Sequence, residues 1–330
     1  MKDLIEEAEV DKLIYNVFNK NCNTKKRISG NDLNVIYNIE MDFQNYILKI
    51  YKCDIPIVKN CVGCMKYVHE KTSIPVPKII SYGENYILME KADGIILEDV
   101  WEKFTYEEKL KIIDQYVDII KALNNLKFQK ICGIDANYNI IPSLFHYRWN
   151  PRFYVDFNHG PFDNIKDFMI AEINKYIKFI EKITSLEKAK ILIPKLNLLI
   201  KKIQDEIIKF SDVDICMTHN DLGPHNILVN SNGIIKSIID WDFAGFNLSY
   251  LEWKISIQDA FFRFPIDEDL KIQNYVINLV EKNIPNIKHN MIIDDVLDCF
   301  RTFICMNPTD DILNNGINNL NNVLKKYNIN

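Results

Sequence analysis

The feature that most constrains the fold lies in residues 216–242, where two short apolar runs flank an Asn-Gly pair. The runs occupy 227–229 (Ile-Leu-Val) and 234–239 (Ile-Ile-Lys-Ser-Ile-Ile), with Asn232 and Gly233 between them. Runs rich in β-branched residues on either side of Asn-Gly are a strong short-range signal of a β-hairpin. We therefore predict a hairpin here and expect neighbouring polar residues to take fixed places at its open end.

Polar residues lie at the open end of this predicted hairpin. Asn226 precedes the first strand and Asp240 follows the second, so their side chains should lie next to each other. Amide and carboxylate oxygens bind hard cations such as Mg²⁺. Asp221 comes five residues before Asn226, on a loop that Gly223 and Pro224 keep irregular. The spacing matches the catalytic base and the two metal ligands of kinases, whereas the short string alone would equally suit a capped polar loop.

Two longer strings extend this match to a known family. HNDLGPHNILV (residues 219–229) followed by IIDWDFAG (residues 238–245) resembles the aminoglycoside phosphotransferase and choline kinase family, and within it the fungal branch. The resemblance implies an α+β, protein-kinase-like fold with two lobes. It implies a β-rich nucleotide-binding lobe with a lead-in helix over 1–92, and a larger, mainly helical lobe with the catalytic loop and acceptor site over 93–330.

The predicted N-terminal lobe contains two candidate phosphate-binding features. A turn with Gly30, Asn31 and Asn34 between two β-like runs exposes backbone N–H groups that can cover the phosphates of a nucleotide. Lys49 lies in the alternating run 46–51, where a lysine usually protects an edge strand. Because a helix and the kinase-like segment follow, and because the family carries the pattern Y-x-L-K-x-Y, we interpret Lys49 as the lysine that binds the α- and β-phosphates.

A strand over 85–90 is followed by a short extended linker. The backbone of such a linker can offer N–H and C=O groups to the edge of adenine. We expect Glu90 to Ala92 to form this hinge and Met89 to lie behind the adenine ring, although an ordinary strand end has the same pattern.

The helix predicted over 56–71 departs from the family. The resemblance implies a glutamate that pairs with Lys49, but Cys61 stands at its position, and Glu70 is the only acid on this helix. Two interpretations stay open. Either Glu70 replaces the missing acid, or Lys49 pairs with Asp240 alone.

Composition excludes several classes of protein. The net charge of −5 provides no basic surface for nucleic acid, and no apolar run approaches the ~20 residues of a membrane helix. The N-terminal residues do not form a signal peptide, and the eight scattered cysteines suit reduced, buried thiols. We expect a cytoplasmic protein that contacts neither nucleic acid nor membrane.

The preferred function is transfer of the γ-phosphoryl group of ATP to the hydroxyl of a small molecule, with Mg²⁺. Asn220 matches the His-Asn-Asp string that is common in choline and ethanolamine kinases, whereas Trp241 stands where those enzymes usually carry phenylalanine. Because Cys61 replaces the expected acid, a catalytically weakened pseudokinase stays an alternative. The segment after Asp240 is short, which disfavours a protein kinase with a regulated activation loop. Amphipathic patterns predict further helices at 3–19, 106–126, 164–184, 186–210, 268–282, 290–305 and 309–327.

Overall fold

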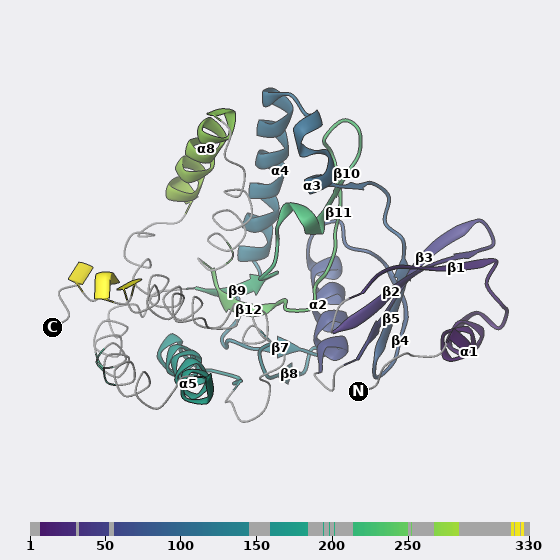
Figure 1. Ribbon diagram of the computed structural model, residues 1–330, viewed down its shortest axis with the longest axis horizontal. Coiled ribbons are helices and arrows are strands. Elements are labelled where there is room, and N and C mark those ends of the chain that lie inside the picture. Colours follow the sequence, from purple (N-terminus) through teal and green to yellow (C-terminus); the bar gives the residue numbers. More distant parts are fainter. Residues whose placement is uncertain are drawn as a thin grey trace. The chain divides into compact units, whose positions relative to one another are not determined.

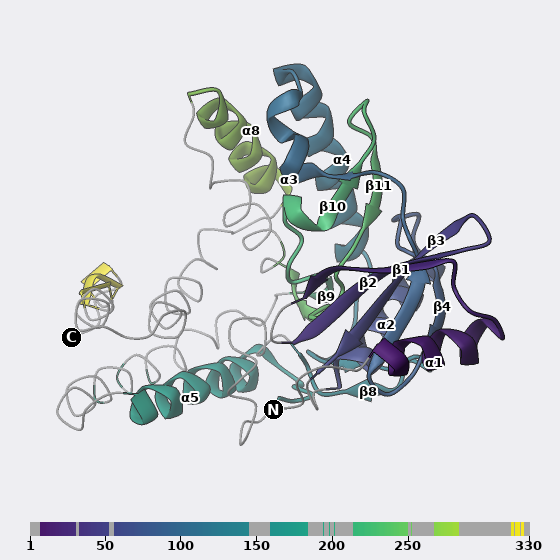
Figure 2. The same ribbon diagram turned by 45° about the vertical axis from the view of Figure 1, so that its right-hand side comes forward.

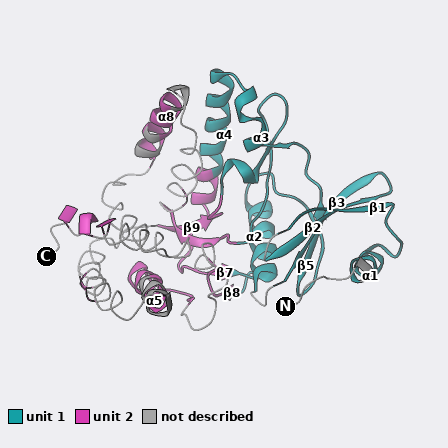
Figure 3. Cartoon of the chain, in the orientation of Figure 1, with its two compact units in different colours: residues 1–119, 134–139, 222–242 teal, residues 120–133, 140–221, 243–330 magenta. Residues whose placement is uncertain are grey.

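The structure, a computed structural model, describes residues 7–30, 33–52, 56–144, 159–183, 214–249, 252 and 267–283, with isolated positions within 194–201 and 318–326. The chain forms two compact units (Figure 3). The first contains residues 1–119, 134–139 and 222–242, and the second contains 120–133, 140–221 and 243–330. The boundaries of these units differ from those of the predicted lobes. The predicted lobe boundary at residue 92 stays a prediction.

A five-stranded antiparallel sheet dominates the first unit, in the order β1-β2-β3-β5-β4 (Figure 1). Its strands are β1 (Thr24–Gly30), β2 (Asn34–Met41), β3 (Gln44–Tyr51), β4 (Ile79–Tyr82) and β5 (Tyr86–Glu90). Strand β2 alternates buried and less buried side chains, as a sheet with one covered face requires. The strands were predicted near these places, and the structure extends β1 and β2 in both directions.

Helix α1 (Glu7–Phe18) lies beside this sheet, as Figures 1 and 2 both show. Its Val10 and Ile14 are fully buried in one cluster with Ile39 and Leu48 of the sheet. At roughly 1.5–3 kcal/mol for each fully buried aliphatic side chain, this apolar stripe is what attaches the helix. The predicted lead-in helix is therefore confirmed and contributes to the core of the first unit.

Helix α2 (Ile57–Lys71) contacts β4 and β5. Its Gly63 approaches segment 134–139 so closely that a Cβ atom would lie 2.2 Å from the carbonyl oxygen of Ile134. No side chain fits at that distance, so a glycine is required for this approach. The predicted helix over 56–71 is confirmed, with its buried face turned toward the sheet.

The predicted hairpin is present as β10 (Ile227–Val229) and β11 (Ile235–Ile238), with Ile227 opposite Ile238. The Asn230 side chain accepts hydrogen bonds from the N–H groups of Asn232 and Ile234. Gly233 adopts φ +71°, which only glycine reaches at no steric cost. Strand β6 (Ile95–Ile96) pairs with the other edge of β10.

The second unit contains an antiparallel pair, β9 (Ile215–Thr218) and β12 (Gly245–Leu248), that brackets the loop at 219–221. The sequence predicted only a short turn after Asp240, so β12 was missed. Helices α5 (Ile165–Ile183) and α8 (Asp267–Asn283) confirm two predicted helices. The helices predicted at 186–210, 290–305 and 309–327 fall largely outside the described residues.

The remaining elements are α3 (Leu97–Val100), η1 (Trp101–Lys103), α4 (Tyr106–Asn124), β7 (Gly133–Ile134), β8 (Ile140–Ile141) and the 3₁₀ turn η5 (Pro224–Asn226). Helix α4 confirms the helix predicted over 106–126. Among the residues that the structure describes, no helix combines the length and the apolar character needed to cross a membrane.

Candidate active site

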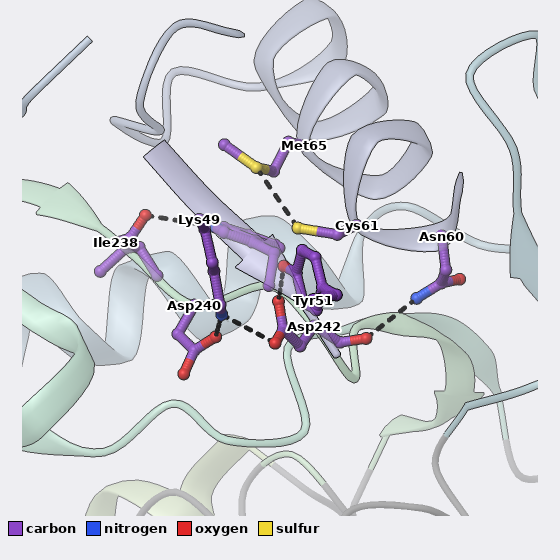
Figure 4. A network of polar contacts seen from close by, with 9 residues as sticks. Lys49, Tyr51, Asn60, Cys61, Met65, Ile238, Asp240 and Asp242 are labelled. Carbon is purple, nitrogen blue, oxygen red and sulfur yellow. Dashed lines mark hydrogen bonds and ion pairs between the residues drawn. The ribbon is translucent and has the colours of Figure 1, made fainter. Parts of the chain in front are cut away.

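Lys49 of β3 lies between two carboxylates of the same unit (Figure 4). Its Nζ atom is 2.5 Å from Oδ1 of Asp240 and 2.7 Å from Oδ2 of Asp242. The Lys49 and Asp242 side chains are only 7% and 4% exposed, whereas that of Asp240 is 42% exposed. One carboxylate therefore faces solvent and the other is enclosed with the lysine.

These charges stabilise each other inside the unit. Burial alone would lower the pKa of Lys49, but the Asp240 and Asp242 carboxylates outweigh it and hold that pKa well above its ordinary value. Burial raises the pKa of Asp242 to about 6, while Lys49 and the Tyr51 hydroxyl act in the opposite direction. Lys49 is thus held as an ammonium ion between the two aspartates.

Tyr51 completes the enclosed side of this cluster. It lies two residues after Lys49 on β3, so both side chains point to the same face of the sheet. Its hydroxyl donates to Oδ1 of Asp242 at 2.6 Å. Burial, with the neighbouring Asp242 carboxylate, raises the pKa of Tyr51 far above its usual range, so it keeps the proton that it donates. Both oxygens of Asp242 are therefore engaged.

The turn after β11 explains why two aspartates reach one lysine. Trp241, between them in sequence, is 1% exposed, and its indole N–H donates to the Ile238 carbonyl oxygen at 2.9 Å. Asp240 adopts a left-handed backbone with φ +65°. The buried indole anchors the turn, and the flanking carboxylates both point to Lys49.

Helix α2 places neutral side chains beside this cluster. Cys61 is buried, with its sulfur 3.7 Å from that of Met65, and burial raises the pKa of its thiol. Glu70 is exposed on the same helix, where burial and, after it, the Glu70 carboxylate raise the pKa of Tyr138 to about 12. The structure thus places Glu70 at Tyr138 and gives Lys49 a second partner, Asp242, that the sequence interpretation had missed.

Asn226 and Asp240 lie at the open end of the hairpin, as predicted. The Ile239 N–H donates to the backbone carbonyl oxygen of Asn226 at 2.9 Å, which holds Asn226 beside the residue before Asp240. Among the described residues, Oδ2 of Asp240 has no hydrogen-bond partner and no cluster of three His, Cys, Asp or Glu could hold a metal. The donor set suits Mg²⁺, which takes one or two protein oxygens and fills its shell with water and phosphate.

The structure places the predicted nucleotide-binding residues in the same unit. Gly30 and Asn34 lie at the facing ends of β1 and β2, and Asn31 lies outside the described residues. Met89 and Glu90 end β5, and Ala92 follows it. Their roles toward a nucleotide stay predictions.

The loop of Asp221 belongs to the second unit. Glu252, which is fully buried, accepts hydrogen bonds from the backbone N–H groups of His219 and Asn220 at 2.6 and 2.9 Å. The Asn220 side chain donates to the Phe243 carbonyl oxygen, and its backbone is left-handed with φ +64°. The loop that presents Asp221 is therefore held by Glu252, a residue that no sequence motif had singled out.

Replacing Glu252 by alanine is expected to lower the free energy of unfolding by roughly 2–6 kcal/mol. Two buried N–H donors would lose their acceptor, and each unsatisfied group costs about 1–3 kcal/mol. Glu252→Gln keeps one acceptor oxygen and is expected to lose less than half as much. Urea unfolding of the three proteins measures the difference, and equal losses in both variants would show that the carboxylate oxygens do not hold the loop.

No curated protein matches the chain. Solved structures do match over nearly their whole length. A thermostable variant of the aminoglycoside phosphotransferase APH(4)-Ia, in complex with ADP and hygromycin B, has a TM-score of 0.61 at 14% identity and covers 96% of this chain and 98% of its own. The gentamicin complex of APH(2")-IIa has a TM-score of 0.62 at 14% identity, with 96% of each chain covered. ADP-bound APH(2'')-Ib gives 0.62 at 15% identity, with 97% of each chain covered.

These matches confirm the predicted α+β, kinase-like fold. The model of the phosphotransferase enzyme family matches residues 25–250, about two thirds of the chain, including the lysine strand, the hairpin and the loop of Asp221. The chain therefore belongs to the phosphotransferase enzyme family, whose members are kinase-type enzymes.

Proposed function

We propose that the protein is a kinase that transfers the γ-phosphoryl group of ATP to a hydroxyl group of a small molecule. The observation that carries this proposal is the buried Lys49 ammonium beside Asp240, at the end of the hairpin that also holds Asn226. A phosphate-binding cation next to a pair of cation-binding oxygens is what phosphoryl transfer needs, because its catalysis consists mainly of positioning and charge neutralisation.

Each residue has a separate task in this proposal. Lys49 binds the α- and β-phosphates, and the β1–β2 turn with Gly30, Asn31 and Asn34 covers them. The oxygens of Asn226 and Asp240 would hold Mg²⁺. When bound, the cation neutralises charge on the phosphates.

Adenine would contact the linker after β5. The Glu90 N–H already donates to the Lys78 carbonyl oxygen at 2.9 Å, and the Lys91 N–H donates to the Asn45 carbonyl oxygen at 3.0 Å. Neither amide is available to a ligand. We therefore assign the donor to adenine to Ala92, the next N–H along the linker, with Met89 behind the ring.

Asp221 is proposed as the base that accepts the proton of the acceptor hydroxyl and orients its oxygen toward phosphorus. The support is its spacing, five residues before Asn226, and the backbone held by Glu252. A short loop joins Asp221 to the metal-ligand candidates, which is the order of elements in kinases.

The acceptor is proposed to be a small hydroxylated molecule. Several similar structures are described as complexes of aminoglycosides, namely hygromycin B, gentamicin and streptomycin. None of the five described cysteines forms a disulfide and four of them are buried, which suits the proposed reducing, cytoplasmic environment.

The test is a screen for ATP consumption with Mg²⁺ and three acceptor sets: aminoglycosides, amino alcohols such as choline and ethanolamine, and hydroxylated amino acids. We expect ADP release coupled to a phosphorylated product with one set, identified by mass spectrometry. ADP binding is measured in parallel by calorimetry. A wild-type protein that binds neither ADP nor ATP in the presence of Mg²⁺ would refute the proposal.

A further inference from the structure

The two carboxylates that contact Lys49 lie at similar distances from it but differ in exposure and in hydrogen bonding. Asp242 is 4% exposed and bonded through both oxygens, to Lys49 and to the Tyr51 hydroxyl. Asp240 is 42% exposed, contacts Lys49 through Oδ1, and has no partner for Oδ2 among the described residues. Figure 4 shows the ammonium group between them, with the second oxygen of Asp240 pointing away.

This asymmetry assigns different tasks to the two residues. An enclosed carboxylate with both oxygens bonded cannot turn toward a ligand without leaving a buried ammonium ion uncompensated, which is strongly unfavourable. An exposed carboxylate can turn away, provided that a second anion stays with the lysine. Asp242 is that second anion, because it remains beside Lys49 whichever way Asp240 points.

Helix α2 places no acid beside Lys49. Helix α2 presents the neutral Asn60 and Cys61 to the cluster, and the Asn60 amide reaches the Asp242 backbone carbonyl oxygen at 3.5 Å. The acid of this helix, Glu70, lies at Tyr138. Among the described residues, the only ion pairs of Lys49 are those with Asp240 and Asp242.

We propose that Asp242 is a positioning residue that holds the Lys49 ammonium from the turn after β11, with Tyr51 fixing its second oxygen, and thereby leaves Asp240 available to a cation. This inference rests on the proposed function, since it concerns the lysine and the carboxylate that would serve the nucleotide and Mg²⁺. It explains how α2 can carry a cysteine where the family resemblance implies an acid: the acid stands on another element.

The test moves the carboxylate from one element to the other. Asp242→Asn keeps the shape and removes the charge, Cys61→Glu places a carboxylate on α2, and the double variant exchanges the two. Glu70→Gln is the matched control, because it removes an acid from the same helix away from Lys49. The readouts are thermal unfolding without nucleotide, and the ratio of ADP dissociation constants in EDTA and in Mg²⁺.

In Asp242→Asn, Asp240 is the only carboxylate of the described residues left on Lys49, so a cation that binds Asp240 competes with the lysine for the charge of that one carboxylate. We expect the gain in ADP affinity on adding Mg²⁺ to fall by ~tenfold or more, together with a lower melting temperature. In Cys61→Glu alone, a further buried carboxylate has no cation, so the melting temperature falls by ~5 °C or more. In the double variant the charges again balance, and both readouts recover part of the loss. Tyr51→Phe is expected to lower the gain in ADP affinity on adding Mg²⁺, as Asp242→Asn does, but by a smaller factor.

Three outcomes would overturn the assignment. These are an unchanged Mg²⁺ gain in Asp242→Asn, additive losses in the double variant, and a Glu70→Gln effect as large as that of Asp242→Asn. Provided that the wild type binds ADP, each of these results would refute the positioning role of Asp242 and leave the proposed function standing. A wild type that binds no ADP would refute the proposed function and this inference with it, whereas additive melting shifts without nucleotide would refute only the inference.

Discussion

Asp221→Asn is expected to lower the rate of phosphoryl transfer by ~10²–10⁴-fold, the usual contribution of a positioned general base. Asparagine keeps the size of the side chain but cannot accept the hydroxyl proton. Lys49, which is proposed to bind the phosphates, and the candidate metal ligands belong to the other compact unit and are unchanged. ADP affinity in the presence of Mg²⁺ is therefore expected to stay within about twofold of the wild type, which is a change of ~0.4 kcal/mol in binding free energy.

The measurement pairs a product assay, using the acceptor that the screen identifies, with calorimetry of ADP. Asp214→Asn is the matched control, because Asp214 is an exposed aspartate of the same unit that pairs at the surface with Lys127. This control should retain full turnover. Near-normal turnover of Asp221→Asn would remove Asp221 from the mechanism, and a joint loss of turnover and ADP affinity would indicate a structural role instead.

Elements that depend mainly on neighbouring residues could be predicted from the sequence. The hairpin could be predicted because the Asn232-Gly233 pair and the Asn230 side chain form its turn within a few residues. The same holds for α2 and for the alternating strand with Lys49. Strand β12 was missed because its sequence, Gly-Phe-Asn-Leu, has no β-branched residue and depends on pairing with β9.

The partners of Lys49 depend on contacts that no short window contains. Tyr51 and Asp242 are 191 positions apart, and their contact exists only because the hairpin turn and β3 meet in the folded unit. Two signals were nevertheless present in the sequence: the second aspartate of Asp-Trp-Asp, and a tyrosine two residues after the lysine on one face of a strand. Glu252 left a weaker trace, since a single acid near an aromatic pair is not a motif.

The second large effect is expected for Asp240→Ala, which should abolish the gain in nucleotide affinity on adding Mg²⁺ and reduce turnover to background. The variant removes the only carboxylate of the candidate metal pair, and an amide oxygen from Asn226 is a weak ligand alone. Affinity for ADP in EDTA should not fall, because Asp242 still compensates Lys49 at 2.7 Å. Calorimetry with and without Mg²⁺ measures both quantities, and an intact Mg²⁺ gain would exclude Asp240 as a metal ligand.

Backbone strain needs its own control, because Asp240 has φ +65° and alanine tolerates that conformation poorly. Asp240→Asn keeps a residue that is enriched in this region and is expected to lose the Mg²⁺ gain to nearly the same extent.

A rescue experiment distinguishes the roles of the two aspartates. Cys61→Glu should restore part of the Mg²⁺ gain to Asp242→Asn and none to Asp240→Ala, because a carboxylate on α2 can replace the partner of a lysine but not a ligand at the end of the hairpin. Equal rescue of both variants would mean that the two carboxylates share one task, and that the difference in their exposure has no functional consequence.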